Sequence, residues 1–311
     1  NLTLTILGTT ENVIGGSKDD VITGNAQANE ITGGPGNDQI NGGTGNDSYF
    51  FADGWGSDTL NDDGGTDALN FSAVATALTF NLQPATFNIS DTTNTVTHTG
   101  SAFDTFIGGT NDDVFNLADS TSLNGYVDGR GGANTLNLSA FSTPHSTLLT
   151  GYGALVGFDG TDTAIPNGFK NITTLNASTS GTADHLTGLN EISQWDIDTL
   201  PGTGGTNTYT AGGRTLNFAN YERLTGGTAA DTFTLTGTQA HTILAGADDD
   251  TLAFNDNAVL TGTFDGQSDH DTIYMLAYTS ARQALLTGLG STDGFTGSIN
   301  GITGGFVNVD G

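Results

Sequence analysis

Hydrophobic and polar positions alternate along this chain with a nine-residue period near its start. Residues 15–50 divide without gaps into four nonads, GGSKDDVIT, GNAQANEIT, GGPGNDQIN and GGTGNDSYF. The eighth position of each nonad is apolar, and these residues are Ile22, Ile31, Ile40 and Tyr49. The last three residues of each nonad therefore predict a short strand whose middle side chain points inward. The Gly-rich first half predicts a tight turn, because Gly permits positive φ.

Two nonads make one solenoid turn of eighteen residues in this interpretation. Ile22 is then expected to stack on Ile40, and Ile31 on Tyr49. Two looser nonads follow at 53–61 and 62–70, after a break in phase at Phe51.

Beyond residue 100 the same pattern returns singly, mostly at spacings of 19 to 24 residues. The sequence between the copies is strand-like, as in 78–82, 135–141, 214–224 and 259–264. One Gly/Asp loop per turn predicts a wider parallel β-helix. One inward column is expected to contain Phe115, Leu136, Tyr209, Phe233, Leu252 and Ile273.

Two segments depart from the strand pattern. Residues 279–289, TSARQALLTGL, are the best candidate for a short helix. Residues 142–170 contain Pro144 and Pro166, and we expect a loop inserted into the solenoid there. Trp55, Trp195 and Tyr221 are expected to pack in the core, although aromatic rings can also stack on sugars.

Charge narrows the possible partners. Lys and Arg total 6 and Asp and Glu total 34, which gives a net charge of −28. Such a surface argues against binding nucleic acid or an anionic membrane and favours cations. The absence of Cys excludes disulfides and thiolate metal sites, and no apolar run approaches the length of a membrane span.

The sixth position of the nonads holds the candidate metal ligands. Asp is a short carboxylate, and together with Gly carbonyls from stacked turns it suits a hard cation, Ca²⁺ above Mg²⁺. In the nonad region the candidate ligands are Asp20, Gly33, Gly34, Gly36, Asp38, Gly42, Gly43, Gly45, Asp47, Asp58 and Asp67. In the single copies they are Asp113, Asp231, Asp248, Asp250 and Asp271. The alternative is that these Asp residues only form turns without a metal, which Asn134 and Asn207 favour in the later copies.

The nonads resemble the RTX calcium-binding repeats of bacterial exported proteins, G-G-x-G-x-D-x-U-x, and residues 33–50 fit that motif at every defined position. Residues 15–32 depart from it, with Lys18, Asn25 and Gln27 in place of Gly and Asn29 in place of Asp. Residues 100–311 are more loosely similar to very large bacterial surface proteins. The resemblance implies Ca²⁺ as the cofactor and an extracellular location.

The expected fold is therefore an all-β, right-handed parallel β-roll/β-helix solenoid with calcium-binding Gly/Asp turns. An RTX-like calcium β-roll is expected over 8–72, a connecting β segment over 73–100 and the wider β-helix over 101–311. Because the chain begins at Asn1 without Met or a signal-peptide pattern, we expect a fragment or processed piece of a longer protein.

The expected function is structural and not enzymatic. The chain is interpreted as a calcium-stabilised segment of a large secreted or cell-surface bacterial protein, such as an adhesin, a surface-layer protein or an extracellular filament subunit. Its expected partners are calcium ions and either further copies, joined end to end, or other surface proteins and glycans. The alternatives are the secretion and folding module of an exported protease, lipase or epimerase, and a solenoid that binds glycans or ice.

Overall fold

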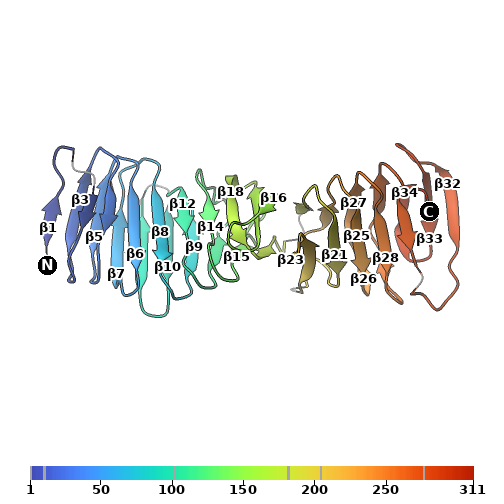
Figure 1. Cartoon of the computed structure of the whole chain (residues 1–311), viewed down its shortest axis with the longest axis horizontal. Coiled ribbons are helices and arrows are strands. Elements are labelled where there is room, and N and C mark those ends of the chain that lie inside the picture. The colour runs from blue at the N-terminus through green and yellow to red at the C-terminus, as the bar shows by residue number, and fades with distance from the viewer. Residues whose placement is uncertain (1, 10–11, 101–102, 181–182, 204, 276) are drawn as a thin grey trace. The chain divides into compact units, whose positions relative to one another are not determined.

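The computed structural model describes residues 2–9, 12–100, 103–180, 183–203, 205–275 and 277–311. In this part of the chain every regular element is a β-strand (Figure 1). Two compact units divide the strands: unit 1 comprises Asn1–Ala140 and Tyr152–Thr173, and unit 2 comprises Phe141–Gly151 and Thr174–Gly311. No helix of the described residues is long and apolar enough to cross a membrane.

Unit 1 consists of two sheets, drawn in blue to green in Figure 1. The first contains β1 (Thr3–Thr5), β3 (Val21–Asn25), β5 (Gln39–Gly43), β7 (Ser57–Asn61), β9 (Thr79–Gln83), β10 (Thr86–Ser90), β11 (Thr95–Thr99), β13 (Val114–Leu117) and β15 (Thr135–Asn137). The second contains β2 (Asn12–Ile14), β4 (Glu30–Thr32), β6 (Ser48–Ala52), β8 (Ala68–Ala73), β12 (Thr105–Ile107), β14 (Val127–Asp128), β17 (Phe158–Asp162) and β18 (Ile165–Ile172).

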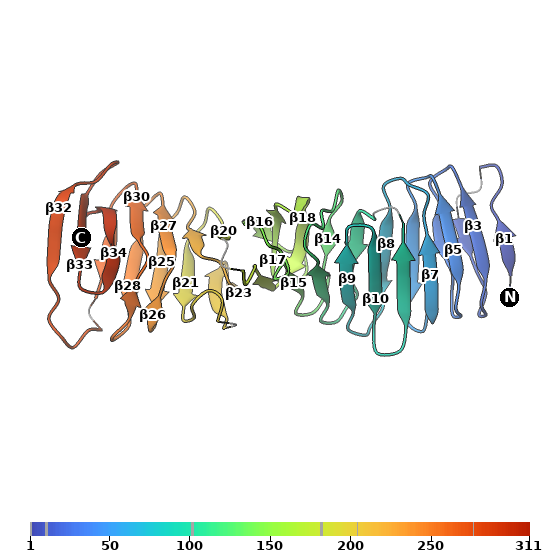
Figure 2. The ribbon, with the colours of Figure 1, turned by 180° about the vertical axis from the view of Figure 1, so that it is seen from behind.

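The strands of unit 2 also form stacked turns, and Figure 2 shows them from behind in yellow to red. One sheet contains β19 (Thr174–Asn176), β21 (Ser193–Ile197), β22 (Asn207–Ala211), β23 (Arg214–Ala219), β25 (Asp231–Leu235), β28 (Thr251–Phe254) and β31 (Thr272–Tyr274). The other strands are β16 (Ser146–Tyr152), β20 (His185–Thr187), β24 (Arg223–Thr225), β26 (Thr238–Gln239), β27 (Thr242–Gly246), β29 (Val259–Leu260), β30 (Phe264–Gln267), β32 (Ala284–Leu289), β33 (Phe295–Ile299) and β34 (Ile302–Val309).

Successive turns of the nonad region stack in parallel and in register. Ile22 of β3 pairs with Ile40 of β5, and Ile31 of β4 pairs with Tyr49 of β6, which confirms both predicted contacts. All four side chains are buried. Because buried residues alternate with more exposed ones along these strands, the apolar residues form continuous inward columns.

Aromatic rings continue these columns. In unit 1 Phe80 stacks on Phe115 with ring centroids 4.3 Å apart. In unit 2 Trp195 stacks on Phe233 at 5.4 Å. Trp55, Trp195 and Tyr221 are 2%, 0% and 0% exposed, as predicted for core residues.

Antiparallel meanders interrupt the parallel order, and the sequence did not predict them. Strands β9–β11 form one meander in unit 1 and β21–β23 another in unit 2. The predicted column holds for three neighbouring pairs, which are Phe115 with Leu136, Phe233 with Leu252, and Leu252 with Ile273. Tyr209 does not pair with Phe233, because Trp195 of the second meander lies between them.

Two further predictions are wrong. Residues 284–289 of the expected helix form strand β32, which pairs antiparallel with β33. Gly288 and Thr287 are poor helix formers, and a partner strand lies close in the sequence. Residues 142–170 are not a loop either, since β16, β17 and most of β18 fall within them. The side chain of Asp162 caps the β17–β18 turn by accepting the Ala164 N–H at 2.9 Å.

Candidate metal centre

Carboxylates at the sixth nonad position form two ladders that connect each turn to the next. In the first, Asp38 Oδ1 accepts the backbone N–H of Asp20 at 2.8 Å, and Asp58 Oδ1 accepts that of Asp38 at 2.9 Å. In the second, Asp67 Oδ1 accepts the N–H of Asp47 at 2.8 Å. Each carboxylate therefore satisfies a buried backbone donor of the preceding turn through one of its two oxygens.

Glycines make room for these carboxylates. A Cβ on Gly33 would lie 2.3 Å from Asp38 Oδ2, and a Cβ on Gly42 would lie 2.3 Å from Asp47 Oδ2. At four other predicted positions a Cβ would lie 2.6 Å or less from backbone atoms of the preceding turn: Gly34, Gly36, Gly43 and Gly45. Gly is therefore required for turn-to-turn approach, and the contribution of its carbonyls to a metal stays a prediction.

The Oδ2 atoms of four ladder carboxylates are the candidate cation ligands, because the backbone N–H groups use only Oδ1. Among the described residues, the buried oxygens without a hydrogen-bond partner include Oδ2 of Asp38, Asp47, Asp58 and Asp67. A buried carboxylate oxygen without a donor is costly. A hard cation satisfies such oxygens directly, since Ca²⁺ binds carboxylate and carbonyl oxygens at flexible sites.

Three buried acids converge at the end of the nonad region. Ligand oxygens of Asp47, Asp62 and Asp67 all lie within 4.8 Å of one another. The Tyr49 hydroxyl donates to Asp62 Oδ2 at 2.5 Å. A Cβ on Gly42 would lie 2.1 Å from the Tyr49 hydroxyl, 2.3 Å from Asp47 Oδ2 and 2.9 Å from Asp62 Oδ2. These oxygens thus surround one small space that a glycine keeps open.

The pKa values of the later ladder acids are shifted in the opposite direction from that of Asp20, the first acid of the first ladder. Burial raises the pKa of Asp58 to about 7, and burial, with a contribution from the Asp62 carboxylate, raises the pKa of Asp67 to about 7. Burial also raises the pKa of Asp47. By contrast, backbone N–H donors from Gly16 and then Leu2 lower the pKa of Asp20. A nearby cation reverses the effect of burial by favouring the charged form.

Three of the predicted ligands have both oxygens engaged within the chain. Asp20 accepts the N–H groups of Leu2 at 2.5 Å and Gly16 at 2.6 Å. Asp113 accepts those of Leu78 at 2.8 Å and Gly109 at 2.7 Å.

Asp231 is held in the same way, by the Gly227 N–H at 2.6 Å and the Ser193 hydroxyl at 2.5 Å. The geometry gives all three residues a turn-forming role, and their role as metal ligands stays a prediction.

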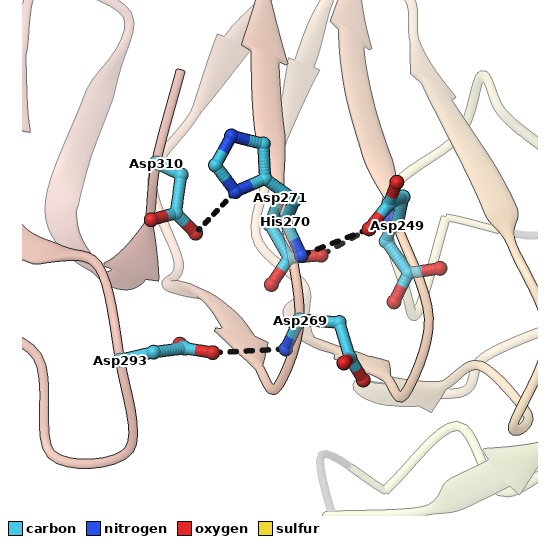
Figure 3. A network of polar contacts seen from close by, with 7 residues as sticks. Asp249, Asp269, His270, Asp271, Asp293 and Asp310 are labelled. Atoms are coloured by element: carbon cyan, nitrogen blue, oxygen red, sulfur yellow. Dashed lines mark hydrogen bonds and ion pairs between the residues drawn. The ribbon is translucent and has the colours of Figure 1, made fainter.

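A second group of acids, here called the acidic corner, lies in unit 2. Figure 3 shows its members Asp249, Asp269, Asp271, Asp293 and Asp310. Asp250 Oδ1 accepts the N–H of Asp231 at 2.7 Å, and Asp271 Oδ1 accepts that of Asp250 at 3.0 Å. Oδ2 of both Asp250 and Asp271 is buried without a partner in the described part of the chain. Asp248 differs, because its side chain is exposed and its Oδ1 accepts the N–H of Asp249 at 3.0 Å. Burial raises the pKa of Asp250 to about 8.

Sequence reasoning missed Asp62 and the Tyr49 hydroxyl as members of the three-acid group. A signal was present, because Asp62 occupies the first position of the looser nonad 62–70, where the motif has Gly. Asp62 is 6% exposed, whereas its neighbour Asp63 is exposed. An acid at a position whose side chain points inward is unusual enough to deserve a structural explanation.

Comparison with known proteins agrees with this geometry. Residues 14–49 match the RTX calcium-binding nonapeptide repeat in 4 copies. The nonad region is thus an RTX repeat block, and RTX repeats bind Ca²⁺. A search of curated proteins finds no match to the chain. The class of protein defined by the fold and this site is an all-β solenoid with an RTX calcium-binding module.

Proposed function

We propose that this chain is a structural, calcium-stabilised solenoid segment of a large secreted or cell-surface bacterial protein, of the adhesin, surface-layer or filament type. The observation that carries the proposal is the group Asp47, Asp62 and Asp67, three buried acids within 4.8 Å that follow directly on an RTX block. Three carboxylates this close repel one another, and a bound cation converts that repulsion into attraction. Calcium therefore determines whether this part of the fold is stable at neutral pH.

The charge of the chain supports the proposed extracellular role. A chain with a net charge of −28 resists compaction by self-repulsion, and calcium neutralises the loops. The binding free energy of the metal becomes folding free energy when the unfolded chain has no formed site. Extracellular calcium modules bind with dissociation constants of about 0.1–1 mM. Such sites are empty in a cytosol and fill outside the cell, so the chain is exported unfolded and folds on arrival.

We also propose that the chain has no catalytic role. Its ladder acids recur once per turn and accept backbone N–H groups. The three acids that do converge, Asp47, Asp62 and Asp67, are buried and surround a space that a Cβ on Gly42 would fill, unlike the open cleft of a substrate site. His98 has a packing role, because its buried ring stacks on Phe87 with centroids 5.2 Å apart. Hydrolysis of casein or of a triglyceride by the purified chain in 1 mM-range calcium would contradict this proposal.

Self-association is proposed through strand β32 of unit 2. Leu285, Leu286 and Leu289 on this strand are 64%, 55% and 79% exposed. An exposed apolar strand edge is a template for pairing with a second copy of the chain. Sedimentation velocity is expected to show oligomers that Leu289→Lys weakens, and a strictly monomeric wild-type chain contradicts the proposal.

The test of the main proposal is hydrogen exchange of the full chain with calcium and with EGTA. Peptides from 15–70 are expected to lose most of their protection in EGTA, because their carboxylates then repel one another. Peptides from 207–235, which contain the aromatic core around Phe233, are expected to keep most of theirs. Equal protection of 15–70 in both conditions would show that its Asp residues only form turns.

A further inference from the structure

The acidic corner of unit 2 contains acids from four separate segments. Two of them are the loops 248–250 and 269–271 of successive turns, and Asp293 lies in the loop between β32 and β33. The Asp248 N–H donates to Asp269 Oδ2 at 3.0 Å, and the Asp269 N–H donates to Asp293 Oδ2 at 2.9 Å. Asp310 follows β34 and completes the group, as Figure 3 shows.

Backbone hydrogen bonds hold Asp310 beside Asp271. The N–H groups of Asp310 and Gly311 both donate to the Asp271 carbonyl, at 2.9 and 3.1 Å. The Ile273 N–H donates back to the Gly311 carbonyl at 2.9 Å. Residues 310–311 therefore run alongside the start of β31, so the Asp271–Asp310 juxtaposition is part of the fold of unit 2.

Four carboxylate oxygens of this corner are buried without a hydrogen-bond partner among the described residues. They belong to four different acids: Asp250 Oδ2, Asp271 Oδ2, Asp293 Oδ1 and Asp310 Oδ2. Asp250 and Asp271 are 1% and 0% exposed. His270 Nδ1 lies 3.8 Å from Asp310 Oδ2, too far for a hydrogen bond, and its side chain is 77% exposed.

The surroundings of Asp271 are strongly negative. Burial raises its pKa to about 7, and the carboxylates of Asp293, Asp310 and Asp249 contribute to the same shift. A Cβ on Gly266 would lie 2.2 Å from Asp271 Oδ2, so a glycine leaves space at the unpartnered oxygen, as Gly42 does in the RTX block. Oxygen donors of this kind suit Ca²⁺ better than Zn²⁺, which selects nitrogen and sulfur.

We propose that a hard divalent cation of the Ca²⁺ type binds between Asp271 and Asp310, with Asp293 at its rim, and fastens the meander β32–β34 to the preceding solenoid turns. This site lies outside the matched residues 14–49. Asp293 and Asp310 belong to no Gly/Asp nonad, so no repeat motif marks them. Calcium binding here does not depend on binding in the RTX block.

The test is hydrogen exchange of the full chain, with calcium alone as the added ligand, in the wild type and in Asp310→Asn. At a calcium concentration 100 times the dissociation constant, exchange in 284–309 is expected to slow by up to about 100-fold in the wild type. Asp310→Asn is expected to abolish this effect and to leave the calcium response of 15–70 unchanged. Asp256→Asn, which removes one exposed charge of the same unit, is the matched control and is expected to behave as the wild type.

Three results would overturn the proposal. They are an unchanged exchange of 284–309 on calcium addition, equal responses of Asp310→Asn and Asp256→Asn, and a response to Zn²⁺ at equal concentration that His270→Ala removes. The last result would assign the corner to a nitrogen-ligated transition metal. Because Asp310 is only partly buried, its replacement leaves the core intact and the variant is expected to fold.

Discussion

The backbone N–H of Asp20 donates to Asp38 Oδ1 at 2.8 Å, while Asp38 Oδ2 stays buried without a partner among the described residues. One oxygen of this carboxylate therefore supports the neighbouring turn, and the other is available to a cation. Turn formation and metal binding are not alternatives for such a residue. The same division recurs at Asp47, Asp58 and Asp67.

Replacing Asp62 tests the three-acid group. Asp62→Asn removes one carboxylate charge next to Asp47 and Asp67 and weakens the hydrogen bond from the Tyr49 hydroxyl. Calcium affinity depends on the number of charged ligands, and loss of even a supporting group around a metal costs about 10–100-fold, so calcium affinity by isothermal titration calorimetry is expected to fall by about tenfold or more. Asp63→Asn removes the same charge at an exposed neighbouring position. Equal effects of both variants would show that only the net charge matters.

Stability without calcium is expected to fall as the pH rises. The folded-state pKa of Asp58 and of Asp67 is about 7, above the unfolded value of about 3.9. The native state therefore binds more protons between these values, and the free energy of unfolding decreases from about pH 4 to pH 7.

Calcium is expected to reverse this trend, because it binds the ionised carboxylates and its stabilisation grows with pH. Thermal melts in EGTA and in calcium, from pH 5 to pH 8, check both signs. A melting temperature in EGTA that rises from pH 5 to pH 8 would contradict the assigned burial of these acids.

Gly42 tests the space between the acids. A Cβ there meets three side-chain oxygens at 2.1 to 2.9 Å, so Gly42→Ala is expected to destabilise the RTX block by about 1–3 kcal/mol and to weaken calcium binding. Gly151→Ala is the control, because a Cβ on Gly151 meets nothing within 4 Å. Denaturant unfolding in calcium measures the difference, and two indistinguishable variants would show that the turns relax freely.

Phe233 tests how far unit 2 depends on its aromatic core. Its ring is fully buried and stacks on Trp195. Phe233→Ala is expected to cost about 3–5 kcal/mol, in calcium and in EGTA alike. A loss that appears only in EGTA would mean that calcium, and not packing, holds this unit together.

Local periodicity was sufficient to predict the stacked turns. Ile22 pairs with Ile40 and Ile31 with Tyr49, because an eighteen-residue repeat sets the register of every strand within it. The antiparallel meander around Trp195 and Tyr209 was beyond this reasoning. Both parallel and antiparallel neighbours bury the same alternate residues, so the hydrophobic pattern does not distinguish them.

The candidate site was predictable in part for the same reason. Repeating Asp residues marked the ladders, whereas Asp62, Asp293 and Asp310 lie near other acids only through tertiary contacts. Nor did the motif separate Asp20, whose two oxygens are both engaged by backbone donors, from Asp38. That distinction depends on how closely each turn approaches the next.

The most direct test of a calcium-stabilised solenoid is an anomalous difference map from crystals of the full chain grown in millimolar-range calcium. The account predicts peaks about 2.3–2.6 Å from Asp47 Oδ2 and Asp67 Oδ2, with Asp62 in the same coordination group. Ordered side chains at Asp47, Asp62 and Asp67 without any peak between them would contradict it.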